Sequence, residues 1–347
     1  MIKAVLLKTE TIIMSTSNKI CNDGASKLND DGVCEMNDML HNMSTAADDN
    51  NNVPVCANCG KEGSDITNTC NKCNSVMYCN AACKKKHRHK HKKDCERRVA
   101  ELHDEKLFKQ PPLQFDDCPI CFLRLPALHS GWRYKTCCGK QICSGCIHAV
   151  RTRDGNIGLC PFCRTPAPTS DKEDTDRLKG KAEVGDAIAI SMMGNYYLEG
   201  MRGFPRDTAK ALELWHKAGE LGYASAHHNM GVAYNIGKGG VQVDKKKGKH
   251  YYELAAMGGD VSARHNLGYI EGKAGNVDRA IKHCLIAAGC GQNNSLQRIQ
   301  RLYSNGDTTK ENYTVALQGY QEYLGEIKSD QRDEAAAFMD GYKYIEN

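Results

Sequence analysis

Paired cysteines constrain this chain more than any other feature. Fifteen of its 19 cysteines lie between Cys56 and Cys163. Five pairs have two residues between their members: Cys56/Cys59, Cys70/Cys73, Cys118/Cys121, Cys143/Cys146 and Cys160/Cys163. This spacing lets two thiolates from one tight turn bind a single tetrahedral ion. We therefore predict that bound zinc, rather than a large apolar core, folds this region.

Disulfide bonds are the competing interpretation, and the N-terminal sequence argues against a secreted protein. Its longest apolar run, Ala4 to Leu7, is too short for the core of a signal peptide, and Lys8 interrupts it. No segment approaches the ~18 apolar residues of a membrane span. We expect a cytoplasmic or nuclear protein without membrane contact, where paired cysteines more often bind metal. Met1 and Met14 are both candidate start residues.

Length and composition favour several small parts over one large domain. A chain of 347 residues suggests two or three domains. Aromatic residues make up only 7% of the chain, which argues against one large sheet-based core and fits small modules with closely packed helices. The formal charge of +5 is mild and does not by itself indicate a nucleic-acid partner.

Shifts in composition divide the chain. The Asn- and Asp-rich stretch before the first cluster is too polar to bury a core, so we predict disorder there, with Cys21 and Cys34 as free thiols. The predicted boundaries are a tail at 1–53, a first cysteine cluster at 54–97, a charged linker at 98–115, a second cysteine cluster at 116–166, a second linker at 167–180, helical repeats at 181–330 and a C-terminal tail at 331–347.

The first cluster supplies ligands for two closed zinc sites. Its spacing is C-x2-C-x10-C-x2-C-x5-C-x3-C-x7-H-x3-C. The eight candidate ligands are Cys56, Cys59, Cys70, Cys73, Cys79, Cys83, His91 and Cys95. They leave no open position for water, so a catalytic zinc is not expected. His87 and His89 are rivals for the histidine position, and the spacing to Cys95 favours His91.

This cluster resembles the MYND zinc finger over its whole length, including the Tyr78-Cys79 pair. The resemblance implies two interleaved sites, one of Cys56, Cys59, Cys79 and Cys83 and one of Cys70, Cys73, His91 and Cys95. It also implies a surface that binds short, often Pro-containing, peptides. No stretch resembles a SET domain, so methyltransferase activity is not expected.

A basic run, KKKHRHKHKK at 84–93, lies on the last predicted helix of the first cluster. It fits either a solvated helix face or a patch for nuclear import or nucleic acid. No aromatic side chains that could stack on bases are interleaved with the charges, which argues against a nucleic-acid partner.

The second cluster supplies eight further cysteines, and with them two more zinc sites, which brings the expected total to four zinc ions. The candidate ligands are Cys118, Cys121, Cys137, Cys138, Cys143, Cys146, Cys160 and Cys163. Cys137 and Cys138 are adjacent, and both can reach one ion if Gly139 allows a tight turn. The alternative pairs Cys138 with His129 and leaves Cys137 free.

The second cluster resembles a RING finger, specifically the all-cysteine RING of the CCR-NOT ubiquitin ligase subunit. The shared segments are CPIC, CGxQIC at 138–143, an Arg-rich helix after Cys146 and the final GLCPFCR. Lys140 occupies the position where most RING fingers have a histidine ligand. The family's cross-brace implies one site of Cys118, Cys121, Cys143 and Cys146 and another of Cys137, Cys138, Cys160 and Cys163.

The RING resemblance implies that the module binds a ubiquitin-conjugating enzyme (E2) charged with ubiquitin. It has no nucleophile and acts by positioning the E2–ubiquitin thioester. Ile120, Val150 and Pro161 match the apolar docking contacts, and Arg164 matches the cation that bridges E2 and ubiquitin. The competing interpretation is structural: Ile120 and Val150 fill a small core, and Arg164 is a solvated charge.

The C-terminal half contains an internal repeat. Shifted by 37 residues, Gly194 aligns with Gly231 and Trp215 with Tyr252, a third copy follows, and a degenerate fourth copy spans 293–328. Such periods predict stacked helix pairs in which small residues let helices approach. The pattern resembles Sel1-like repeats, relatives of tetratricopeptide solenoids, which bind protein partners. His227, His228 and His265 are interpreted as ordinary helix residues, and Cys284 and Cys290 as small apolar packing groups.

Together these features predict a multidomain chain: two small zinc-stabilised cross-brace modules followed by an all-α Sel1-like helical-repeat solenoid. The leading hypothesis is a RING-type E3 ubiquitin ligase that recruits an E2 and ubiquitin through the RING, and a substrate or adaptor through the repeats and the MYND-type finger. The alternative is a non-catalytic zinc-finger/Sel1 scaffold that mediates protein–protein interactions. Substrate, E2 partner, chain linkage and oligomeric state stay open at this stage.

Overall fold

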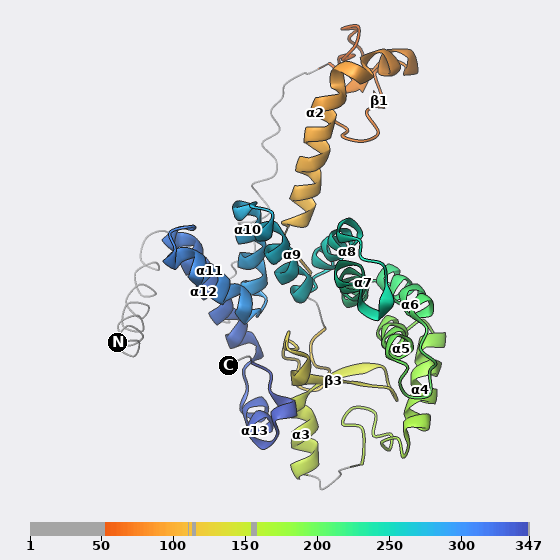
Figure 1. Cartoon of the computed structure of the whole chain (residues 1–347), viewed down its shortest axis with the longest axis vertical. Coiled ribbons are helices and arrows are strands. Elements are labelled where there is room, and N and C mark those ends of the chain that lie inside the picture. The colour runs from red at the N-terminus through yellow and green to blue at the C-terminus, as the bar shows by residue number, and fades with distance from the viewer. Residues whose placement is uncertain (1–52, 110, 113–115, 154–157, 346–347) are drawn as a thin grey trace, which may run out of the picture. The chain divides into compact units, whose positions relative to one another are not determined.

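The computed structural model describes residues 53–345 apart from 110, 113–115 and 154–157 (Figure 1). The predicted disorder of the N-terminal tail and the states of Cys21 and Cys34 therefore lie outside the described residues. Backbone contacts divide the chain into two compact units. The first unit is Met1–Thr69 with Met77–Lys86, and the second is Cys70–Val76 with His87–Asn347.

The described part of the first unit is small and contains little apolar material. Strand β1 (Asn68–Thr69) pairs antiparallel with β2 (Met77–Tyr78). Apart from Cys56, its buried hydrophobic residues are Ile66 and Tyr78, which are 0% and 1% exposed. So few buried side chains cannot offset the entropy of ordering the chain, which agrees with a fold that depends on metal.

Helix α2 (Ala81–Leu107) is longer than the sequence suggested. The stretch 98–107 was predicted to be a linker, but it continues the helix. Its residues favour helix, and Arg98 forms ion pairs with Glu101 and Glu105 one and two turns further on. In the described part of the chain, no helix is both long and apolar enough to cross a membrane.

The C-terminal end of α2 is anchored in the repeat region of the second unit. Leu107 is fully buried in a cluster with Tyr252 and Leu267. The guanidinium of Arg264 donates a hydrogen bond to the Leu107 carbonyl, one of the carbonyls that a helix end leaves without a partner. Asp104 forms an ion pair with Arg279. The helix that carries His91 and Cys95 is therefore fixed at its far end by packing.

The second cysteine module (116–166) is a hairpin followed by a helix. The short 3-10 helix η1 (His129–Gly131) leads into β3 (Trp132–Lys135), which pairs antiparallel with β4 (Lys140–Cys143). Helix α3 (Ser144–Arg153) follows directly. The buried core of the module comprises Leu125, Trp132, Ile142, Ile147 and four of its cysteines, with Ala335 and Tyr342 from the C-terminal end of the chain.

The repeat region consists of stacked helices. Their bounds are α4 (Asp171–Glu183), α5 (Ala187–Glu199), α6 (Thr208–Glu220), α7 (Ala224–Ile236), η2 (Lys238–Gly240), α8 (Lys245–Met257), α9 (Val261–Lys273), α10 (Val277–Gly289), α11 (Asn293–Ser304) and α12 (Lys310–Ile327). The predicted fold class, a cysteine-rich zinc-binding region followed by a helical-repeat solenoid, is confirmed.

In the repeats, small residues let neighbouring helices approach, as the sequence predicted. A Cβ atom on Gly194 would lie 2.7 Å from the ring of Trp215, and one on Gly231 would lie 2.5 Å from the ring of Tyr252. Because glycine has no side chain, it leaves space for the large aromatic ring of the following helix. The repeated aspartates also have a role, because Asp207 and Asp244 cap α6 and α8 through backbone N–H groups.

The predicted second linker at 167–180 and the predicted C-terminal tail at 331–347 both contain helix. The second linker becomes α4 from Asp171 onward, because the N-cap Ser170 accepts a hydrogen bond from the Glu173 N–H while Glu173 accepts one from the N–H of Thr169, the residue before the cap. The C-terminal tail forms α13 (Asp330–Phe338) and the short helix η3 (Asp340–Tyr342). It is ordered because Arg332, Ala335, Tyr342 and Tyr344 are buried.

Candidate metal centres and neighbouring surfaces

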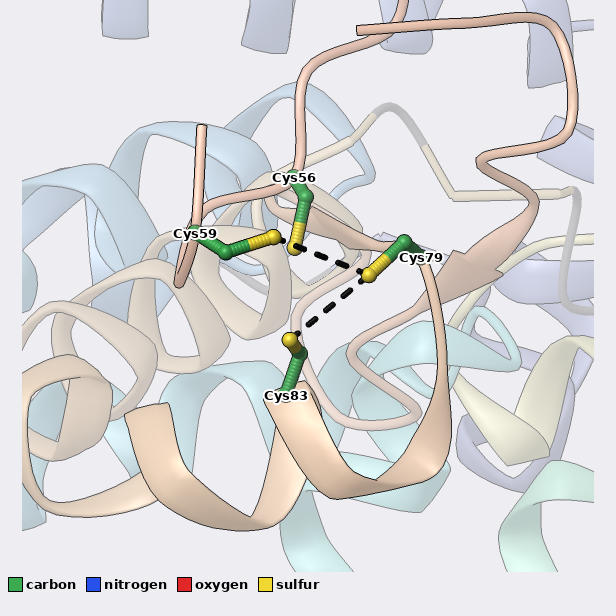
Figure 2. A group of neighbouring side chains, drawn as sticks. All are labelled: Cys56, Cys59, Cys79 and Cys83. Atoms are coloured by element: carbon green, nitrogen blue, oxygen red, sulfur yellow. Dashed lines mark hydrogen bonds between the residues drawn. The ribbon is translucent and has the colours of Figure 1, made fainter. Parts of the chain in front are cut away.

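The first group of ligands, the Cys56 site, gathers four sulfurs from three short elements (Figure 2). Cys56 and Cys59 come from one turn, Cys79 follows β2, and Cys83 lies in the first turn of α2. The Sγ atom of Cys79 lies 3.7 Å from that of Cys59 and 3.6 Å from that of Cys83. Backbone N–H groups, first that of Cys79, lower the pKa of the Cys56 thiol to about 6, which favours the thiolate that binds metal.

The second group, the Cys70 site, combines Cys70, Cys73, His91 and Cys95, all of which are buried. His91 and Cys95 face the same way from successive turns of α2. The Nε2 atom of His91 is 3.2 Å from Cys73 Sγ, and the sulfurs of Cys70 and Cys95 are 3.7 Å apart. His87 stacks on the ring of His91, and the ligand group does not include it.

The third group, the Cys118 site, joins the start of the second cysteine module to its helix. Its members are Cys118, Cys121, Cys143 and Cys146. The sulfurs of Cys121 and Cys143 are 3.8 Å apart, and the backbone N–H of Cys146 points to Cys143 Sγ at 3.4 Å. Three of the four cysteines are almost fully buried, which makes this the most enclosed of the all-cysteine groups.

The fourth group, the Cys137 site, contains both adjacent cysteines. Cys137 Sγ lies 3.4 Å from Cys163 Sγ, and Cys138 Sγ lies 3.9 Å from Cys160 Sγ. Gly139 makes this possible: its φ is +71°, and its N–H bonds the Lys135 carbonyl at 2.8 Å to close the turn. His129 instead lines a cavity with Tyr320 and Tyr323, away from the ligand group. The geometry favours the interpretation in which both neighbours bind metal.

Four of the pairs share one backbone conformation, which we call a knuckle. In it, the N–H of the residue after the second cysteine donates a hydrogen bond to the carbonyl of the first cysteine. The four residues in this position all have positive φ: Gly60, Asn74, Phe122 and Arg164. Gly60 and Asn74 accept this conformation readily, whereas it costs the larger Phe122 and Arg164 about 1–2 kcal/mol each. Sequence reasoning missed this feature, although the position after each pair could have revealed it.

The donors in all four groups suit zinc. Each group offers four thiol or imidazole ligands whose donor atoms lie within 4.8 Å of one another. Sulfur and imidazole in sets of four are the ligands of structural zinc, and no position is left open for a water. None of the described cysteines forms a disulfide. The four clusters therefore fit the four zinc ions that the sequence predicted.

The four candidate E2 contacts do not share one pocket. Val150 and Pro161 line a cavity of about 380 Å³, together with Ile147 and with Arg177 of α4. Ile120 is half-buried against the core of the module, and Arg164 is exposed. Two aromatic residues that sequence reasoning did not single out stand at the knuckles. Phe122 is 76% exposed and Phe162 is 44% exposed.

The second cysteine module contacts the repeat region both near its beginning and near its end. The Tyr134 hydroxyl donates to Asp186 at the start of α5 at 2.7 Å, and burial with this carboxylate raises the pKa of Tyr134. At the other end, the Tyr323 hydroxyl of α12 accepts the Ala127 N–H at 2.8 Å, and Arg124 pairs with Glu326. The module is thus built into the second unit rather than tethered to it.

Two family models match this chain. The MYND finger model matches residues 56–95, and the Sel1 repeat model matches 187–223, 224–260 and 261–291. The chain therefore contains a MYND finger and three Sel1 repeats, as its sequence predicted. The predicted fourth copy falls on α11 and α12, beyond the residues that the model matches.

Curated relatives match only a short stretch. E3 ubiquitin-protein ligase GW2 of Oryza sativa, subspecies indica and japonica, is 40% identical over 53 residues, which are 15% of this chain. This chain spans only 12% of the length of those relatives.

Two solved structures that are similar to this chain are described as having an SLR fold or Sel1 repeats. The antigen c5321 of uropathogenic Escherichia coli, with an SLR fold, is 25% identical at a TM-score of 0.40, over 50% of this chain and 38% of that one. A Sel1 repeat protein from Oxalobacter formigenes is 22% identical at a TM-score of 0.39, over 51% of this chain and 75% of that one.

Proposed function

We propose that this protein is a RING-type E3 ubiquitin ligase built on a zinc-finger and repeat scaffold. The second cysteine module binds a ubiquitin-charged E2, and the Sel1 repeats and the MYND finger bind the substrate or an adaptor. The observation that carries the proposal is the interleaving of the Cys118 and Cys137 sites around one hairpin and one helix. The GW2 ligases, which match a short stretch of this chain, point the same way. Paired cysteines that bind metal instead of forming disulfides suit a cytoplasmic or nuclear setting.

Strain at the knuckles supports a docking role for this module. Phe122 and Arg164 hold left-handed backbone conformations that glycine would adopt without cost, and both side chains are exposed. The knuckle requires this conformation but does not require these side chains, and strained conformations are commonly found at functional positions. An exposed aromatic residue beside Ile120, and a cation beside Pro161, suit a partner surface that is apolar with an acidic or carbonyl-rich rim.

The module contributes position rather than covalent chemistry. In the transfer step, a substrate amine attacks the thioester carbonyl of the E2–ubiquitin conjugate, the new C–N bond forms, the C–S bond breaks and the E2 thiol leaves. Ile120, Val150 and Pro161 would hold the E2, while the Arg164 guanidinium would donate hydrogen bonds that keep ubiquitin in a reactive orientation. Zinc, when bound to the sixteen ligands, supplies the cross-links that keep the knuckles in place.

A non-catalytic scaffold is the second candidate, and one observation favours it. The cavity that contains Val150 and Pro161 is also lined by Pro166, Pro168 and Arg177, which lead into or belong to the first repeat helix. This part of the chain therefore covers some of the face that an E2 would need. In a scaffold, the second cysteine module would serve only to hold the repeats.

The two functions separate in a discharge assay with full-length, zinc-loaded protein. A preformed E2–ubiquitin thioester is mixed with the protein and free lysine, and thioester loss is followed for a panel of E2s. Ligase activity predicts accelerated discharge with at least one E2, and Ile120→Ala should reduce the acceleration at least about tenfold.

A glycine substitution tests the knuckle argument with a matched control. Arg164→Gly relieves the strained backbone, so the protein should keep its zinc and stability but lose most of its acceleration. Asn74→Gly relieves the same conformation in the MYND finger and should leave discharge unchanged. If no E2 is discharged faster in the presence of protein that carries four zinc ions, the scaffold function stands instead.

A further inference from the structure

The C-terminal segment 329–345 packs closely on the second cysteine module. A Cβ atom on Gly145, the residue before the ligand Cys146, would lie 2.9 Å from the side chain and backbone of Arg332. The Ser144 hydroxyl donates to the Tyr342 carbonyl at 3.1 Å, and Arg151 donates to the Tyr342 hydroxyl at 3.0 Å. The chain end thus contacts the stretch of α3 that carries a zinc ligand.

Arg332 is the centre of this contact. It is 0% exposed, and one of its Nη atoms donates to the carbonyls of Arg124 and Ile327 at 2.9 and 2.7 Å. The other Nη lies 3.4 Å from the Leu123 carbonyl and 3.9 Å from Cys121 Sγ. Leu123 and Arg124 directly follow the Cys118 knuckle, so the guanidinium holds the backbone that leaves it.

Burying a guanidinium is costly unless hydrogen bonds or a nearby negative charge compensate the loss of water. No carboxylate among the described residues lies within ion-pair distance of Arg332, and the partners of its Nη atoms are neutral carbonyls and one ligand sulfur. A zinc ion bound by four thiolates carries a net charge of about −2, which is itself costly to bury. When the guanidinium and the zinc–thiolate group are adjacent, the attraction between their opposite charges lowers the cost of burying both.

Arg264 provides an internal comparison. It is also buried, at 2% exposure, and its guanidinium donates to the carbonyls of Leu107 and Ala256. None of those partners is a zinc ligand. The two arginines therefore share burial and carbonyl partners, and differ in the sulfur that only Arg332 reaches.

We propose that the C-terminal segment is an integral part of the Cys118 site, and that Arg332 is its internal counter-cation. The positive charge stabilises the zinc-bound thiolates, and the carbonyl bonds fix the loop that presents Ile120 and Phe122. Arg332 is a positioning residue: it acts through the ligands and does not touch a partner. This role is independent of whether the module transfers ubiquitin, and it depends only on the zinc site.

Thiol labelling of the full-length, zinc-loaded chain tests the proposal. Wild type, Arg332→Met, Arg332→Lys and the control Arg264→Met are treated with N-ethylmaleimide under a zinc chelator, and labelled cysteines are mapped by mass spectrometry. Arg332→Met should label Cys118, Cys121, Cys143 and Cys146 about tenfold faster, with the release of one zinc ion of four, because supporting groups of this kind change metal affinity about 10–100-fold. Arg332→Lys, which keeps the charge, should fall between Arg332→Met and wild type.

Three results would overturn the proposal. The first is labelling of the Cys118 site in Arg332→Met at the wild-type rate. The second is equal labelling in Arg332→Met and Arg332→Lys, because charge would then have no part. The third is equal acceleration at all four sites, or the same acceleration of the Cys118 site in Arg264→Met, because Arg332 would then be only a general packing residue. Zinc release and labelling do not involve an E2, so failure here leaves the ligase proposal untouched.

Discussion

The Cys56 site and the Cys118 site use the same knuckle but differ in what surrounds them. At the Cys56 site, Cys59 is exposed, and Ile66 and Tyr78 are the large side chains buried in the described part of the unit. At the Cys118 site, the ligands lie in a core with Trp132 and Ile142, to which the chain end adds Ala335 and Tyr342. The same ligand chemistry thus serves as the main source of stability in one place and as reinforcement of a packed core in the other.

Removal of zinc should have the largest effect and should separate the Cys56 site from the packed repeat helices most clearly. A structural zinc site contributes about 10–16 kcal/mol in isolated fingers, so chelation should unfold residues 56–83 completely. The helices of residues 187–291 bury their own core and should persist. Hydrogen exchange after chelation, with zinc content measured in parallel, checks this. Protection that survives at 56–83 in metal-free protein would break the comparison.

Truncation after Lys328 should have the next largest effect, and should act on one site only. The deletion removes the buried Arg332, Tyr342 and Tyr344, so it should destabilise the second cysteine module by more than about 4 kcal/mol. Thermal unfolding and the rate of zinc release report this loss. Hydrogen exchange of residues 56–83 serves as the control and should not change. An unchanged midpoint would mean that the chain end contributes nothing to the module.

Alanine substitutions at two equally buried positions should cause intermediate losses of stability. The loss of protection should stay local in one variant and extend further in the other. Ile66 and Ile142 are both 0% exposed, and replacement of either by alanine should cost about 2–5 kcal/mol locally. Ile142→Ala should also weaken protection in α13, because the core of the module includes Ala335. Ile66→Ala should lower protection only near the Cys56 site. Hydrogen exchange resolves the two patterns, and an equally local loss in both variants would contradict the difference.

Loss of the surface ion pairs on α2 should have the smallest effect on stability. Arg98 forms exposed pairs with Glu101 and Glu105, so Arg98→Ala should lower stability by less than about 1 kcal/mol. Leu107→Ala, at the buried end of the same helix, is the contrasting variant and should cost about 2–5 kcal/mol. Denaturant unfolding of both variants would show whether packing, rather than surface charge, anchors this helix.

Local patterns in the sequence predicted much of this architecture. The spacing of cysteines and His91 indicated which ligands share a finger, and the 37-residue period paired Gly194 with Gly231 before the rings beside them were seen. These features succeed because ligand spacing and helix packing depend on neighbours close in sequence. The competition between Cys138 with His129 and Cys137 with Cys138 stayed open, because spacing alone does not show how tightly a turn at Gly139 closes.

Contacts between distant segments were not predictable in this way. The apolar residues of the tail at 331–347 do not by themselves show what they pack against, because their partners lie far away in the sequence: the Ser144–Tyr342 hydrogen bond spans 198 residues. Arg332 illustrates the limit, because a charged residue near a chain end is expected on the surface. Only the joint presence of the ligand sulfurs and the knuckle carbonyls explains its burial.

Packing of the chain end on the Cys118 site has a consequence for synthesis. At about 5–20 residues per second, the ribosome needs roughly 8–34 s to proceed from Cys163 to Arg332. For part of that interval all eight thiols of the module have left the exit tunnel, while Arg332 has not yet been made. A nascent chain that stops before Arg332 would therefore carry the eight ligands of the module without the cation that we propose protects the Cys118 site.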